Sequence, residues 1–120
     1  MVLARRGKAP LALMAYQNRL RITPAVTGDA VWLRIMGDLD LGTASDLSMA
    51  LGDAERGNPM IVGLELSRVE FADVTALRIF VAAARRARLK GRRFVLANPS
   101  RTVRRMLAVT SLDRTLDVLA

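Results

Sequence analysis

The chain contains no cysteine and no histidine. Without cysteine there is no disulfide, no thiolate metal site and no thiol nucleophile. Without histidine the chain lacks the commonest general base and the commonest metal ligand, so a Ser-His-Asp triad is excluded. Its glycines also lack the spacing of a P-loop or of a dinucleotide-binding turn. We therefore expect a protein that is not an enzyme and that holds no metal and no cofactor.

Aromatic residues are few, with three Phe, one Tyr and one Trp among 120 residues. The hydrophobic content is nevertheless 52%, so we expect a single domain with an aliphatic core. The longest apolar run, residues 9–16, falls far short of the roughly 20 residues that span a membrane. We expect residues 1–17 to form a basic, mobile tail and residues 18–120 to form the domain. The sequence thus predicts a cytoplasmic protein without membrane insertion.

Charge is unevenly distributed along the chain, whose formal net charge is +8. Ten Lys or Arg and no acid lie between Arg78 and Arg105, whereas most of the acids precede this block. A basic block attracts acidic protein surfaces or nucleic acid. Phe80 and Phe94 are the only aromatic residues within the block, and no helix-turn-helix or zinc pattern is present. We therefore interpret the block as a solvated helix face and expect no direct binding of nucleic acid.

Hydrophobic periodicity predicts alternating strands and helices after an opening hairpin. The first strand is predicted at a sheet edge, because Pro24 cannot donate to a central ladder. The predicted strands cover residues 18–27, 31–36, 60–66, 94–97 and 115–119, and the predicted helices cover residues 44–56, 74–90 and 100–108. Strand–helix–strand crossovers imply parallel pairing, so the hairpin makes the sheet mixed. The predicted class is α/β, with a mixed four- to five-stranded sheet and helices packed against it.

The stretch Phe71–Leu77 is the most informative one, because it joins a buried strand to the strongest predicted helix. In that helix the apolar stripe is predicted to contain Leu77, Phe80, Val81 and Ala84. Asp73 suits an N-cap, which places Thr75 in the first turn near unpaired backbone N–H groups. A phosphate there would meet the positive end of the helix dipole. The geometry suits a reversible phosphoacceptor, and the alternative is that both residues only begin the helix.

Three aspartates, Asp38, Asp40 and Asp73, each follow a predicted strand and could meet at one end of the sheet. A phosphotransfer receiver uses such a cluster with magnesium and an aspartyl phosphate. The opening hairpin and the missing lysine after a late strand argue against that class. We expect instead that residues 37–42 form a loop and that Thr43 or Ser45 caps the next helix.

Several segments resemble, in the right order, the STAS domains of bacterial anti-sigma factor antagonists. Leu66–Leu77 is similar to the family's signature loop, which reads Phe-x-Asp-Ser-Ser-Gly-Leu. Gly37–Ala44 resembles its Gly-Glu-Leu-Asp segment, Asn98–Leu107 its Ser-Pro helix start, and Ser111–Asp113 the Gly-Leu segment that follows. The resemblance covers about residues 18 to 118 and implies a single STAS-like domain.

The resemblance implies that Thr75 is the phosphoacceptor, since it occupies the position of the serine that an anti-sigma factor kinase phosphorylates. It implies a partner-binding surface made of Asp40, Asp73, Val74, Thr75 and Ala76. The implied partner is an anti-sigma factor of the serine/threonine kinase type. The unphosphorylated protein would bind this partner and release a sigma factor, and phosphate on Thr75 would block binding.

The signature departs from the family pattern at three consecutive positions. Val74 replaces the first serine, Thr75 replaces the phosphoserine, and Ala76 replaces a glycine that permits unusual backbone dihedral angles. The alternative function is therefore a STAS interaction module without phosphoregulation, in a transporter or a multiprotein signalling assembly.

Overall fold

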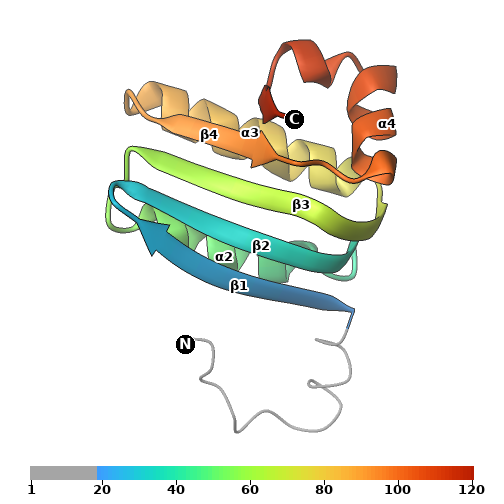
Figure 1. The fold of residues 1–120 in the computed structure, drawn as a ribbon, viewed down its shortest axis with the longest axis horizontal. Coiled ribbons are helices and arrows are strands. Elements are labelled where there is room, and N and C mark those ends of the chain that lie inside the picture. Colours follow the sequence, from blue (N-terminus) through green and yellow to red (C-terminus); the bar gives the residue numbers. More distant parts are fainter. Residues whose placement is uncertain (1–18) are drawn as a thin grey trace, which may run out of the picture.

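A five-stranded sheet in the order β1-β2-β3-β4-β5 forms the centre of the computed structural model, which describes residues 19–120 (Figure 1). The strands are β1 Leu20–Thr27, β2 Ala30–Leu39, β3 Ile61–Ala72, β4 Arg93–Ala97 and β5 Asp117–Leu119. The helices are α2 Ala44–Glu55, α3 Val74–Leu89 and α4 Arg101–Val109, with a 3-10 turn η2 at Leu112–Arg114. The tail predicted for residues 1–17 lies outside the described residues.

The mixed pairing predicted from the sequence is confirmed. Strand β1 pairs antiparallel with β2, and all later neighbours pair parallel. Pro24 lies in β1, opposite Leu33 of β2. Because β1 is at the edge of the sheet, the missing N–H of Pro24 interrupts no central ladder. Within residues 19–120, no helix combines the length and the apolar character needed to cross a bilayer.

Strands β2 and β3 run further than the sequence predicts, and the loop predicted at residues 37–42 is wrong for its first three residues. Gly37 has φ +114°, and the β2–β3 register shifts on either side of it. A Cβ at Gly37 would lie 2.1 Å from the carbonyl oxygen of Arg19, so only glycine fits there. Asp38 then donates its N–H to that same oxygen at 2.8 Å. The acidic, glycine-containing composition indicated a loop, whereas pairing with β3 keeps the segment in the sheet.

The hydrophobic core lies between the sheet and helices α2, α3 and α4. In Figure 1, α2 and α3 lie behind the strands, and α4 lies beside the end of β3. Fully buried side chains come from every layer, among them Ile35, Leu47, Leu51, Leu64, Leu66, Phe80, Leu96, Val103 and Leu107. The core is aliphatic as predicted, and Phe80 contacts Phe94 within it at a ring-centre distance of 6.4 Å.

Helix α3 buries a stripe that differs in part from the predicted one. Its buried residues are Ala76, Leu77, Phe80 and Ala83. Ala84 is half-buried, whereas Val81 is 41% exposed, so its assignment to the core stripe was wrong. The side of α3 that packs against the sheet is centred on Phe80, and Val81 lies beyond the edge of that side.

Replacing Leu77 by Ala should destabilise the fold by about 2–5 kcal/mol, because the side chain is buried and its loss leaves a cavity. The matched control is Val81→Ala on the same helix, which should change the free energy of unfolding by no more than about 0.5 kcal/mol. Urea unfolding followed by circular dichroism measures both. Equal destabilisation by the two variants would contradict this placement of α3.

Candidate functional site

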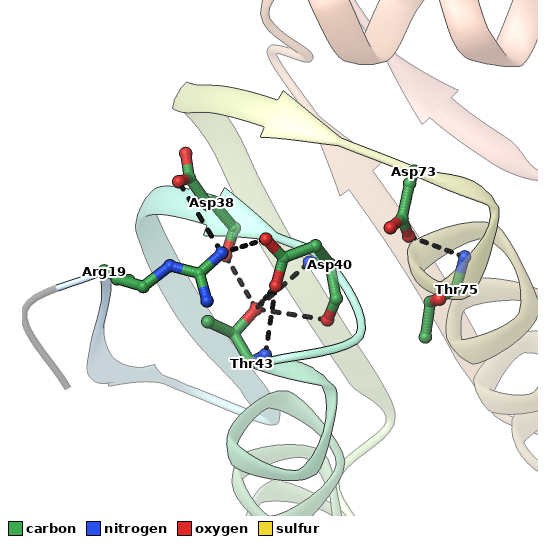
Figure 2. A network of polar contacts seen from close by, with 6 residues as sticks. All are labelled: Arg19, Asp38, Asp40, Thr43, Asp73 and Thr75. Atoms are coloured by element: carbon green, nitrogen blue, oxygen red, sulfur yellow. Dashed lines mark hydrogen bonds and ion pairs between the residues drawn. The ribbon is translucent and has the colours of Figure 1, made fainter. Parts of the chain in front are cut away.

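The junction between β3 and α3 holds the residues that the sequence singled out. Asp73 is extended at φ −128° and occupies the N-cap of α3. Its Oδ1 atom accepts a hydrogen bond from the Thr75 N–H at 2.8 Å, which confirms the predicted cap (Figure 2). Thr75 therefore lies in the first turn of α3. The residue is half-buried, and among residues 19–120 its hydroxyl has no hydrogen-bond partner.

Strand pairing brings a second connection to the same end of the sheet. The Asp73 N–H donates to the carbonyl oxygen of Leu39 at 3.1 Å, where β2 ends. Asp38 lies opposite Phe71 in the same parallel ladder. The chain leaving β2 through Asp40 therefore runs beside the chain leaving β3 through Asp73, as parallel strand ends should.

Thr43 holds the connection from β2 to α2 in one shape. Its side chain is fully buried, its hydroxyl donates to the Asp38 carbonyl at 2.8 Å and accepts the Asp40 N–H at 3.1 Å. Asp40 Oδ1 in turn accepts the Thr43 N–H at 3.2 Å. Thr43 occupies the N-cap position of α2, but its side chain makes no hydrogen bond to the helix. Thr43 therefore stabilises the loop before α2 instead of capping the helix through its side chain. Ser45, the other predicted cap, lies inside the helix.

Arg19 is a component of the site that the sequence analysis missed. Its guanidinium donates to Asp40 Oδ2 and lies 3.9 Å from Asp38 Oδ2 (Figure 2). Arg19 and Asp40 are 21 residues apart, and nothing local in the sequence indicates that they pair. Among residues 19–120, no group of three acidic side chains is arranged to hold a metal ion. The aspartates are thus engaged with Arg19, Thr43 and the α3 cap rather than gathered on a shared centre.

Three large apolar side chains are exposed at these connections. Leu41 is 80% exposed, Val74 is 61% exposed and Phe71 is 50% exposed. We name the set Asp40, Leu41, Phe71, Asp73, Val74 and Thr75 the junction surface. Leu41 and Phe71 were not predicted as site residues, although an apolar residue in a predicted loop was a usable signal. A surface of this composition suits docking by a protein, with the Thr75 hydroxyl inside it.

Ala76 lies differently from the other predicted partner-binding residues. Its side chain is 1% exposed and packs in the core, so it cannot contact a partner directly. Among residues 19–120, the non-glycine residues with positive φ are Asn58, Asn98 and Ser111. Alanine in place of the family's glycine therefore meets no backbone strain here, and it favours the helix.

Comparison with known proteins gives a consistent result. The family model described as "Mlab, STAS domain" matches residues 22–119. The anti-sigma-F factor antagonist RsfB of Mycobacterium tuberculosis is 31% identical over 102 residues, which cover 85% of this chain and 83% of that protein.

Two solved structures share the fold. An anti-sigma factor antagonist from Mycobacterium paratuberculosis has a TM-score of 0.76 at 23% identity, covering 83% of this chain and 85% of its own. A putative anti-sigma factor antagonist from Thermotoga maritima has a TM-score of 0.76 at 25% identity, covering 82% and 86%. Together with the matched residues 22–119, these likenesses establish that the chain belongs to the STAS domain family.

Proposed function

We propose that this protein is an anti-sigma factor antagonist that binds an anti-sigma factor of the kinase type through the junction surface. We further propose that phosphorylation of Thr75 turns this binding off. The observation that carries the proposal is the Asp73-capped junction, where Thr75, whose hydroxyl makes no hydrogen bond within residues 19–120, lies among exposed apolar side chains. The names of the relatives described above support the same role, and a partner of this type implies a cytoplasmic protein.

The position of Thr75 suits a phosphate that is stable in the fold and disruptive at the interface. In the transfer, the γ-phosphoryl group of ATP passes to Thr75 Oγ1, ADP leaves, and the hydroxyl proton is released. The product adds about −1.5 to −2 charges at the N-terminus of α3, where the helix dipole favours negative charge. The same charge, placed within the junction surface beside Val74, would have to be desolvated when a partner docks. Binding is therefore expected to weaken although the fold remains.

The two other departures from the family signature do not obstruct this chemistry. Val74 points outward and is 61% exposed, so it enlarges the apolar part of the surface. Ala76 is buried below it and adds no bulk beside the hydroxyl. Threonine differs from serine by one methyl group, which we expect to slow transfer without preventing it.

The apolar part of the junction surface should supply most of the affinity. We expect the double variant Leu41→Ala/Val74→Ala to weaken binding of the anti-sigma factor by about tenfold or more, because exposed apolar anchors are buried on docking. The probes are the anti-sigma factor kinases encoded in the source genome, each purified and titrated by calorimetry. The matched control is Val109→Ala, whose side chain is 78% exposed on α4.

The control should bind as the wild type does, and all variants should keep their unfolding midpoints, because none of the three side chains is buried. Equal weakening by Val109→Ala, or unchanged binding by the double variant, would place the partner on another face.

Phosphorylation is tested with the anti-sigma factor that binds, labelled ATP and intact-mass spectrometry. We expect one phosphate on the wild type and on Thr75→Ser, and none on Thr75→Ala. Thr75→Glu, which places a carboxylate at the first turn, should bind more weakly than Thr75→Ala. A wild type that takes up no phosphate, together with a Thr75→Glu variant that binds as tightly as wild type, would favour the unregulated STAS module.

A further inference from the structure

The exposed face of α3 carries an unusual mixture of side chains. Val74, Arg78, Val81, Arg85 and Leu89 follow one another at intervals of three or four residues, which places them along one side of the helix. All five are exposed, and the three apolar ones are exposed by 61%, 41% and 77%. We name these five residues the α3 stripe. A solvated helix face is normally polar, so three exposed aliphatic side chains at this spacing indicate a contact surface.

The arginines of the α3 stripe have no acid to pair with. Helix α3 contains no acidic residue, so no i, i+4 ion pair forms along it. Arg78 and Arg85 make no ion pair with any residue between 19 and 120. The neighbouring Arg86 behaves differently, since its Nε and Nη2 atoms donate to the Glu55 carboxylate at 2.9 and 2.8 Å.

This difference divides the basic block of the sequence into two kinds of residue. Within the fold, Arg86 is neutralised by Glu55 and Arg93 by Asp117. Arg78 and Arg85 point away from the core between apolar neighbours, with their charge uncompensated. Most of the block makes no ion pair within residues 19–120, so the exposed apolar neighbours, rather than the missing pairs, set Arg78 and Arg85 apart from a purely polar solvated face.

The α3 stripe also continues the junction surface, because Val74 belongs to both. From Val74 to Leu89 it extends about 22 Å at 1.5 Å per residue, which is the length of a four-turn helix. We propose that the α3 stripe docks an acidic amphipathic helix of the protein partner. Leucine-like side chains of that helix would contact Val74, Val81 and Leu89, and carboxylates would pair with Arg78 and Arg85. The proposal rests on the proposed function for the identity of the partner, and on the stripe alone for its chemistry.

The first test uses a peptide, so that it does not depend on the partner. The probe is a 16-residue helical peptide with leucines spaced to meet the apolar residues of the stripe and glutamates spaced to meet the arginines. A second peptide carries lysine in place of each glutamate. Titration into the ¹⁵N-labelled protein should shift amides of α3, and the Kd of the acidic peptide should rise about tenfold in Arg78→Glu/Arg85→Glu. The charge-matched control, Arg21→Glu/Arg114→Glu, reverses two exposed arginines outside α3 and should leave Kd unchanged.

Three results of the peptide test would overturn the proposal. They are equal binding of the acidic and the lysine peptides, an unchanged Kd in Arg78→Glu/Arg85→Glu, and the absence of shifts in α3 at millimolar peptide. Duplex DNA and phosphatidylglycerol vesicles are titrated in parallel. Stronger binding of either one to the stripe than of the acidic peptide would also overturn it, in favour of a nucleic-acid or membrane surface.

The second test measures association with the anti-sigma factor that binds in the calorimetric experiment. Arg78→Glu/Arg85→Glu should lower the on-rate about tenfold at physiological salt and reduce its salt dependence. If Leu41→Ala/Val74→Ala weakens binding while the arginine variant does not, the docking proposal fails and the proposed function stands. If no anti-sigma factor binds the wild type, the proposed function fails and the peptide test alone decides the α3 stripe.

Discussion

The parallel pairing of β2 with β3 is the interaction on which the site depends. The ladder runs from Ala30 opposite Ile61 to Leu39 opposite Ala72, past the point where β4 ends opposite Glu65. The hydrogen bond from the Asp73 N–H to the Leu39 carbonyl extends it by one step. As a result, the connections to α2 and α3 leave the sheet side by side. A junction surface assembled from two distant segments follows directly from that register.

Buried polar and small residues fix the shape of the junction surface, and exposed apolar residues leave it open to contact with a partner. Thr43 ties the backbone of one connection with its hydroxyl, and Ala76 lets α3 pack closely against the core. Outside them, Leu41 and Val74 remain uncovered although each exposes apolar area to water. In a chain without histidine or cysteine, such a surface has little chemistry of its own. In the proposed phosphorylation, the Thr75 hydroxyl would depend on a partner that supplies ATP and the catalytic groups, as the proposed kinase-type anti-sigma factor would.

Local rules predicted the parts of the site that local interactions build. Asp73 as N-cap and Thr75 in the first turn follow from capping chemistry within three residues, and both are confirmed. The extension of β2 from Gly37 to Leu39 was missed because its hydrogen bonds come from β3, about thirty residues later in the chain. The pairing of Arg19 with Asp40 was missed because the two residues are 21 positions apart in the sequence. Val81 was misplaced because a period of 3.6 residues leaves the edge of an apolar stripe undetermined until the sheet fixes its centre.

The most direct test of the junction surface is hydrogen–deuterium exchange of the protein, free and bound to the anti-sigma factor that it recognises. We expect slower exchange on binding in peptides covering residues 38–44 and 71–78, because docking there would shield both connections from solvent together. Residues 57–62 and 90–94, at the opposite end of the sheet, should exchange at the same rate in both states. Protection confined to that opposite end, with none at residues 71–78, would contradict the account.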